Sequence, residues 1–131
     1  MNYYLKFSFI FFIILNFDKI NAQNYSLPST YDECMRTATN WCNCYFNECY
    51  SGRKFKEIYS IKEHYQMNDE VGDHTYIQGK VHYDNYLDLP QSWVFIMKVY
   101  GDKIIFSKQS ISPSTGKLVW ETCSKRRGYC R

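Results

Sequence analysis

The sequence predicts a fold of the α+β class that leans towards all-β. We expect a short Cys-rich N-terminal helix followed by an antiparallel sheet of about five strands, stabilised by disulfides. Cysteine and aromatic residues recur at helical spacing shortly after residue 30. From residue 53 onward, runs rich in β-branched and aromatic residues alternate with Gly, Pro, Asn and Asp. The 131-residue chain also holds six Cys, a density typical of small extracellular domains.

Residues 1–22 have the pattern of a secretory signal peptide, in which a positively charged start precedes an apolar run. Asp18 and Lys19 end this run well short of the roughly 20 apolar residues that span a membrane. We therefore expect cleavage after Ala22, with an uncleaved anchor as the alternative. Cleavage would leave residues 23–131 as a single secreted, extracellular domain with no transmembrane segment.

Composition narrows the classes of protein that this chain can represent. A length of 131 residues suits one domain and argues against a multidomain enzyme. The formal net charge of +3 is too mild to make nucleic acid the expected partner. Asn24 begins an Asn-Tyr-Ser acceptor for N-glycosylation close to the expected mature start, so we expect a glycoprotein if this site is used.

The first element of the domain is expected to be a helix that begins after Thr30. Thr30 and Glu33 have the spacing of a capping box, in which each side chain satisfies a free backbone N–H group. The residues that follow form one stripe on a helical wheel: Cys34, Ala38, Trp41, Cys42, Tyr45 and Cys49.

The cysteines limit how far this helix can run if every one of them is paired. We assign all six to disulfides: Cys34, Cys42, Cys44, Cys49, Cys123 and Cys130. Two Cys separated by two or eight positions on one helix cannot bond to each other. A helix through 31–50 would therefore leave two thiols over. We expect the helix to end near Trp41 and 42–49 to form a stapled turn; an intermolecular disulfide is the alternative.

The rest of the domain is predicted to be a meander of short strands. The segment 93–100 is apolar on both faces apart from Lys98, which indicates a central strand. Gly101 and Asp102 then form a two-residue hairpin link to the next strand. The expected strands are 55–65, 75–83, 93–100, 103–106 and 117–122.

The histidines do not form a metal-binding pattern. His74 and His82 would share one face of a continuous strand, because their separation is even. A zinc site needs three or four converging ligands. We therefore expect no metal and no cofactor.

A small secreted ribonuclease is one enzymatic alternative. Such an enzyme can use two histidines as general acid and base, with a cationic side chain to stabilise phosphate charge. His64, His82 and Lys80 have these residue types. Other catalytic motifs are absent from the sequence, so we do not expect an enzyme.

The C-terminal tail contains the candidate binding residues Lys125, Arg126, Arg127 and Tyr129. A bond between the flanking Cys123 and Cys130 would close a small ring around them, with roughly 2.5 kcal/mol of stabilisation. A pre-organised cationic tip beside an aromatic ring suits an acidic partner such as a channel vestibule, a sulfated glycan or an anionic lipid surface. A solvated basic turn and a proteolytic processing site are the alternatives.

These observations favour a secreted, disulfide-stabilised binding protein that acts on an extracellular target, of the toxin, venom-component or effector type. Its partner would be an extracellular protein, a channel, a glycan or an anionic surface, and not nucleic acid. Two alternatives stay open: a small secreted hydrolase such as a ribonuclease, and a structural secreted protein that assembles through disulfides.

Overall fold

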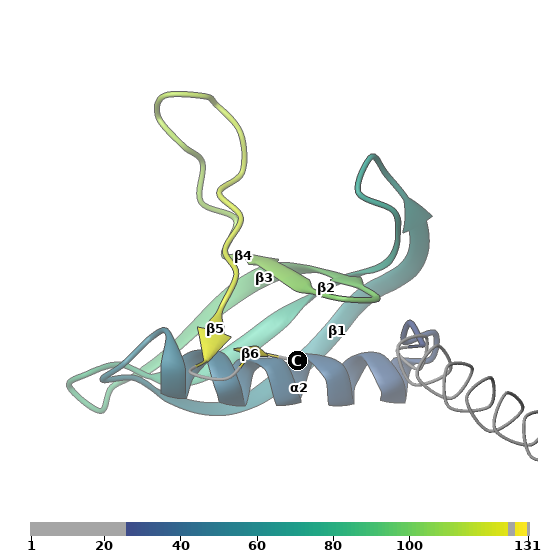
Figure 1. The fold of residues 1–131 in the computed structure, drawn as a ribbon. Coiled ribbons are helices and arrows are strands. Elements are labelled where there is room, and N and C mark those ends of the chain that lie inside the picture. Colours follow the sequence, from purple (N-terminus) through teal and green to yellow (C-terminus); the bar gives the residue numbers. More distant parts are fainter. Residues whose placement is uncertain (1–25, 126–127, 131) are drawn as a thin grey trace, which may run out of the picture.

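A computed structural model describes residues 26–125 and 128–130 (Figure 1). The expected leader 1–22 and the acceptor Asn24 lie outside the described residues. The described elements are helix α2 (Tyr31–Glu48) and strands β1 (Lys54–Asn68), β2 (Asp73–Asp84), β3 (Pro90–Tyr100), β4 (Ile104–Ser107), β5 (Ser124–Lys125) and β6 (Gly128–Tyr129). Strands β1 to β4 form one antiparallel sheet in that order, while β5 and β6 form a separate pair.

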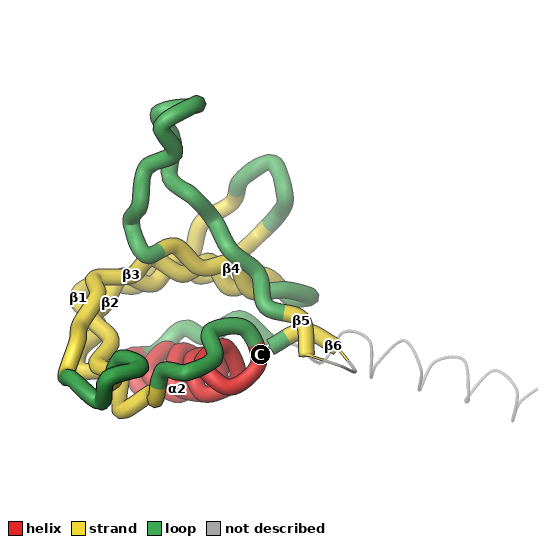
Figure 2. Tube along the Cα trace, turned by 90° about the vertical axis from the view of Figure 1, so that its left-hand side faces the viewer, coloured by secondary structure: helices red, strands yellow, loops and turns green. Residues whose placement is uncertain are grey.

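The molecule has two layers, a sheet that curves over one helix (Figure 2). The predicted class, a helix followed by an antiparallel meander, is confirmed, and β3 is a central strand as expected. The sheet has four strands because 117–122 forms no strand of its own. Glu121 makes a single bridge to Phe106, and the middle of the segment between β4 and β5 projects away from both layers (Figure 1).

Helix α2 begins at the predicted cap. The Thr30 hydroxyl accepts a hydrogen bond from the Glu33 amide at 3.2 Å, and the Glu33 carboxylate accepts one from the Ser29 amide at 3.3 Å. The carboxylate thus reaches one residue further back than in the expected capping box. This arrangement satisfies backbone donors that the first helical turn leaves free.

The expectation that this helix ends near Trp41 is wrong. It continues to Glu48, and the Cys49 amide still donates to the Tyr45 carbonyl at 2.8 Å. Tyr45 and Phe46 are buried, so the second half of the helix packs as the first half does. The hydrophobic stripe was therefore a better guide to the helix end than the assumption that every Cys is paired.

The disulfide pattern differs from the expected three bonds for the same reason. Cys44 is bonded to Cys130 and Cys49 to Cys123, both within the usual Cα–Cα range at 5.5 and 5.9 Å. Cys34 and Cys42 are buried free thiols. The ring that a bond between Cys123 and Cys130 would have closed is not formed, because the long helix brings Cys44 and Cys49 to them instead.

Strand β1 gains its curvature from three irregularities in its pairing with β2. The register shifts once after Phe55, once after Ile58 and once after Ile61. The 15 residues of β1 therefore pair with only 12 residues of β2. Each β-bulge adds an unpaired residue and increases the local twist. The apolar side chains of β1 consequently recur every three residues, and the sheet bends around the helix.

Gly79 on β2 allows the backbone of β1 to come close at the bulge near Ser60. A Cβ atom at this position would lie 2.4 Å from the Ser60 carbonyl oxygen and 3.0 Å from the Phe95 ring. No other residue type fits there without movement of β1 or of the Phe95 side chain. This glycine therefore supports the bulged pairing between β1 and β2.

The core between the layers is mostly aromatic. The Trp41 ring lies 4.8 Å from the Tyr45 ring and 4.7 Å from the Phe106 ring, measured between centroids. The cluster continues along the helix to Tyr50 and Trp93, which are only partly buried and whose rings lie 5.2 Å apart. The aromatic core thus reaches the surface near the C-terminal end of α2.

Candidate functional site

The predicted basic tip is a hairpin fixed at its base by two disulfides. Strands β5 and β6 pair, and the Cys130 amide donates to the Cys123 carbonyl at 2.8 Å. Each of these cysteines is bonded to a different residue at the end of α2. Of the expected binding residues, Lys125 and Tyr129 have described backbones, and Arg126 and Arg127 lie outside the described residues. Both ends of the tip are therefore attached covalently to the helix.

Beside this base lies a cluster that the sequence did not predict, which we call the ammonium cage. It consists of the rings of Tyr45, Tyr50 and Trp93 and the carboxylate of Glu121, arranged around the side chain of Lys108. The Lys108 ammonium lies 4.2 Å from the Tyr50 ring centroid, 4.5 Å from Trp93 and 5.9 Å from Tyr45. These distances are within the range of cation–π attraction.

The Glu121 carboxylate of the ammonium cage interacts with both Tyr45 and Lys108. Glu121 accepts a 2.7 Å hydrogen bond from the Tyr45 hydroxyl, and its other oxygen lies 3.8 Å from the Lys108 ammonium. Burial, together with the hydrogen bond to Glu121, raises the pKa of Tyr45 well above its ordinary value. This phenol therefore stays a neutral donor at physiological pH.

A second cation contacts the same aromatic surface from outside the cage. The Arg53 guanidinium lies 4.1 Å from the Tyr50 ring centroid and 5.9 Å from the Tyr86 ring centroid. Tyr86 is 68% exposed, at the turn between β2 and β3. The end of the molecule near the C-terminus of α2 thus combines partly buried and exposed aromatic rings with a partly buried cation.

A polar cluster occupies the opposite end of strands β2 and β3. The Asp69 carboxylate accepts hydrogen bonds from the Tyr100 hydroxyl at 2.6 Å and from the Lys98 ammonium at 3.3 Å. It also accepts bonds from the amides of Val71 and Gly72. The bond from Tyr100, reinforced by those from the turn amides and Lys98, holds the pKa of Asp69 far below its usual range.

His74 is covered by this polar cluster. Its Nδ1 lies 3.2 Å from the Gly72 carbonyl oxygen and 3.8 Å from Asp69, and its ring lies 4.7 Å from the Tyr100 ring. In the described part of the chain its Nε2 has no hydrogen-bond partner, and the residue is 1% exposed. A substrate would have no access to this imidazole without movement of the 69–72 turn.

The histidines of the ribonuclease hypothesis are not brought together. His64 pairs with Ile77, whose side chain faces the helix, whereas His82 lies on the outer face with Lys80. His82 stacks on Tyr59, with ring centroids 4.6 Å apart, and contacts Glu57 at 3.3 Å. His64 and His82 therefore point to opposite faces of the sheet and cannot act on one substrate as acid and base.

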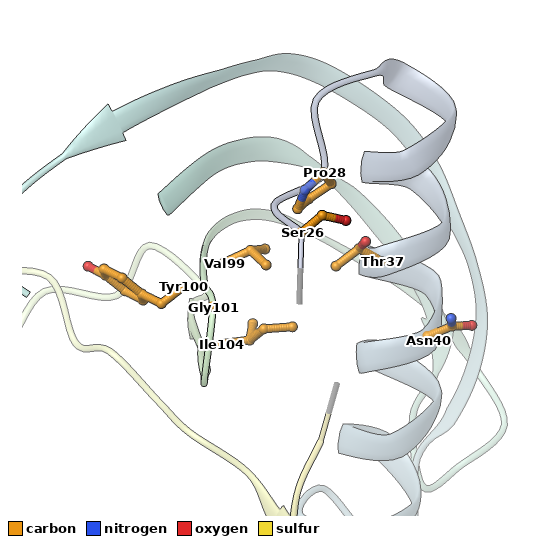
Figure 3. Close-up of a pocket in the computed structure, with 8 residues that line it drawn as sticks. All are labelled: Ser26, Pro28, Thr37, Asn40, Val99, Tyr100, Gly101 and Ile104. Carbon is orange, nitrogen blue, oxygen red and sulfur yellow. The ribbon is translucent and has the colours of Figure 1, made fainter. Parts of the chain in front are cut away.

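A small pocket lies between α2, the segment before it, and the β3–β4 turn (Figure 3). Its volume is about 170 Å³, below the size of most small-molecule sites. Ser26, Thr37 and Asn40 are polar groups on its lining, and the Tyr100 ring points away from it. No charged side chain of the described residues lines this pocket.

The two free thiols are not placed as nucleophiles. Burial, with a smaller effect of the Glu33 charge, raises the pKa of Cys34 to about 11. Burial raises the pKa of Cys42 still further. Because the thiolate is the reactive form, both side chains are inert in the folded protein at neutral pH.

Within residues 26–125 and 128–130, no three His, Cys, Asp or Glu side chains converge as metal ligands would. In the same ranges, no helix combines the length and apolarity needed to span a bilayer. No protein-family model, no curated protein and no solved structure matches this chain.

The ammonium cage shows why sequence reasoning missed a candidate site. Tyr45 and Tyr50 come from the helix end, Trp93 from β3, and Lys108 and Glu121 from the two sides of the projecting segment. No short motif contains more than two of these residues. Only the tertiary structure, which includes the bridge between Glu121 and Phe106, brings them together.

Proposed function

We propose that this protein is a secreted binding protein that recognises an acidic extracellular partner through its C-terminal tip. It would act as a toxin or host-directed effector does, outside the cell that makes it. The observation that carries this proposal is the double attachment of the tip, through Cys44–Cys130 and Cys49–Cys123, to the end of α2.

This attachment supports binding because it reduces the entropy that a flexible cationic loop would lose on contact with a partner. The tip carries Lys125, Arg126 and Arg127 in consecutive positions. Arginine side chains bind carboxylate, sulfate and phosphate groups through paired hydrogen bonds. A polyanionic glycan, an acidic protein surface and an anionic membrane share this chemistry.

The test is a triple variant, Lys125→Ala, Arg126→Ala and Arg127→Ala, measured for binding to immobilised heparin and to phosphatidylserine-containing vesicles. We expect at least a tenfold loss of affinity for the polyanion that the native protein binds. The affinity of the native protein should also fall with added salt, because exposed charges are screened.

The matched control removes three exposed cationic side chains elsewhere, with Arg36→Ala, Lys62→Ala and Lys117→Ala. It changes the net charge by the same amount, and we expect less than a twofold change in affinity. An equal loss in both variants would mean that net charge alone governs binding. That result, or full binding by the tip variant, would refute the proposal.

The two alternatives to this function gain no support from the described geometry. His64 and His82 face opposite sides of the sheet, so the ribonuclease constellation is not assembled. Cys34 and Cys42 are buried, so an intermolecular disulfide through either would require α2 to leave the sheet. A simple binding protein needs neither arrangement.

A further inference from the structure

The ammonium cage has the composition of a site that recognises organic cations. Three aromatic rings lie within cation–π distance of one positive charge, and a carboxylate adds direct attraction. In this structure the charge is supplied by the chain itself, through Lys108. The occupant therefore shows which chemical class the cage accepts.

The aromatic walls of the cage are held by contacts that do not involve Lys108. Tyr50 packs against Tyr45 with ring centroids 5.6 Å apart and against Trp93 at 5.2 Å. Trp93 in turn packs against Tyr83 at 4.5 Å and Phe46 at 5.7 Å. The rings would therefore keep their places if the lysine side chain moved away.

The carboxylate wall is fixed in a similar way. The Glu121 backbone exchanges two hydrogen bonds with Phe106, of 2.8 and 2.7 Å, and its side chain accepts the Tyr45 hydroxyl. Phe106 is fully buried, which anchors this bridge to the core. Glu121 is thus positioned by the fold and not by its ion pair with Lys108.

The occupant, in contrast, can leave without rearrangement of the backbone. The Lys108 side chain is 21% exposed, and its nearest carboxylate oxygen is 3.8 Å away, beyond hydrogen-bond distance. Its ammonium is joined to the chain by four flexible methylene groups. Rotation about these bonds, which takes nanoseconds in partly exposed residues, would move the charge into solvent.

We propose that the ammonium cage is a binding site for a small organic ammonium ion, primary or N-methylated, which displaces Lys108 from the three rings. Self-occupancy lowers the apparent affinity by the fraction of molecules in which the cage is empty. The site uses none of the tip residues, so it stands or falls separately from the proposed recognition of an acidic partner.

The first experiment measures choline binding by calorimetry to the native protein and to Lys108→Ala. We expect Lys108→Ala to bind choline at least tenfold more tightly, because the competing side chain is gone. The neutral isostere 3,3-dimethylbutan-1-ol should not bind detectably, since it lacks the charge. Lys103→Ala is the matched control, because this lysine lies 5.7 Å from the Tyr100 ring and should leave choline affinity unchanged.

A second variant tests the carboxylate. Glu121→Gln in the Lys108→Ala background keeps the hydrogen bond with Tyr45 available but removes the negative charge. We expect a loss of choline affinity of about fivefold, which is the upper end of the range for an exposed ion pair. Equal binding of choline and its neutral isostere by Lys108→Ala, or no gain over the native protein, would overturn the proposal.

A measurement on the native sequence makes the test independent of how the variants fold. Reductive ¹³C-methylation keeps the lysine charges and gives each lysine its own N-methyl NMR signal. The Lys108 signal should be displaced upfield by the three rings, and added choline should return it to the position of exposed lysines. If the Lys108 signal is not displaced in the free protein, Lys108 does not occupy the cage. If choline does not move a displaced signal, choline does not displace Lys108, and either result would refute the proposal.

Discussion

Asp69 shows how one turn residue can connect two strands. It is the first residue of the turn between β1 and β2, where its carboxylate accepts a hydrogen bond from the Val71 amide at 2.9 Å. The same carboxylate accepts a hydrogen bond from the Tyr100 hydroxyl on β3. Aspartate commonly makes the first of these contacts in turns. The second contact depends on tertiary structure, so the sequence predicted the turn but not the link to β3.

Replacement of this carboxylate should change how stability depends on pH. The pKa of Asp69 is lower in the folded protein than in the unfolded chain, where it is about 3.9. Its contribution is therefore fully present above that value and is lost as the pH falls towards the folded-state pKa. We expect Asp69→Asn to be less stable at pH 7 and to lose less stability between pH 5 and pH 2, as measured by urea unfolding.

Asp102→Asn provides the comparison, because Asp102 is an exposed carboxyl in the β3–β4 turn. It should unfold at the same urea concentration as the native protein at pH 7, with the same pH dependence. If Asp69→Asn and Asp102→Asn behaved alike, the hydrogen bonds to Asp69 would not contribute to stability in solution.

At the scale of elements, the hydrophobic stripe of α2 and the breaks between strands were sufficient to predict most of the fold. The stripe runs on through Tyr45 to Cys49 and so matches the observed helix, although we expected the helix to end near Trp41. The assumption that every Cys is paired was wrong, and it led to the expectation that the helix ends near Trp41. The spacing in β1 could not be interpreted from the sequence, because three bulges turn an alternating strand into a period of three.

The two disulfides are nested, and this affects what each contributes to stability. They close loops of 86 and 74 residues, for which chain entropy gives about 4.5 kcal/mol each when formed alone. Once one bond exists, the other closes only the short segments 44–49 and 123–130. The same relation then gives about 3 kcal/mol.

We therefore expect paired serine variants to show non-additive losses. Cys44→Ser with Cys130→Ser, or Cys49→Ser with Cys123→Ser, should each reduce the free energy of unfolding by about 3 kcal/mol. Removal of all four should cost about 7 kcal/mol, enough to unfold a domain of ordinary stability. Urea unfolding measures all three. Losses in the two paired variants that summed to the loss in the quadruple variant would contradict the nested arrangement.

At the scale of the whole molecule, the class was predictable because the helical pattern ends before the first strand pattern begins. What the sequence could not predict is which segments close the sheet. The segment 117–122 has the apolar residues of a strand, yet it forms only two bridges, at Glu121 and Leu118. At Glu121 the segment does meet the edge strand β4, through Phe106, but the pairing does not continue to either side. The ammonium cage depends on the path of this segment, which places Glu121, and for that reason the sequence did not predict the cage either.

The state of the thiols reports on the integrity of the whole fold. In the native protein, iodoacetamide should modify no Cys within minutes at pH 8, because Cys34 and Cys42 are buried and their pKa values are raised. In denaturant without reductant, mass spectrometry should find two modified thiols, and after reduction six. Modification in the native state would then track global unfolding.

Two other outcomes would contradict this account. No modified thiol in denaturant would mean that a third disulfide is present, so that α2 could not be continuous. Rapid modification of the native protein would mean that the helix separates from the sheet under ordinary conditions. Intact mass of the natural protein would also test whether it starts at Gln23 and whether Asn24 carries a glycan.

The nested disulfides also impose an order in time on a chain that emerges from a ribosome. Cys49 must wait for Cys123, which is 74 residues later, or about 4 to 15 s at ordinary rates of synthesis. During that interval, four thiols between 34 and 49 are present together with no correct partner. Helix formation needs only microseconds, and the helix holds these side chains at spacings that do not meet the geometry of a disulfide. Helix α2 would thus prevent premature oxidation among its own cysteines until the last residues of the domain arrive.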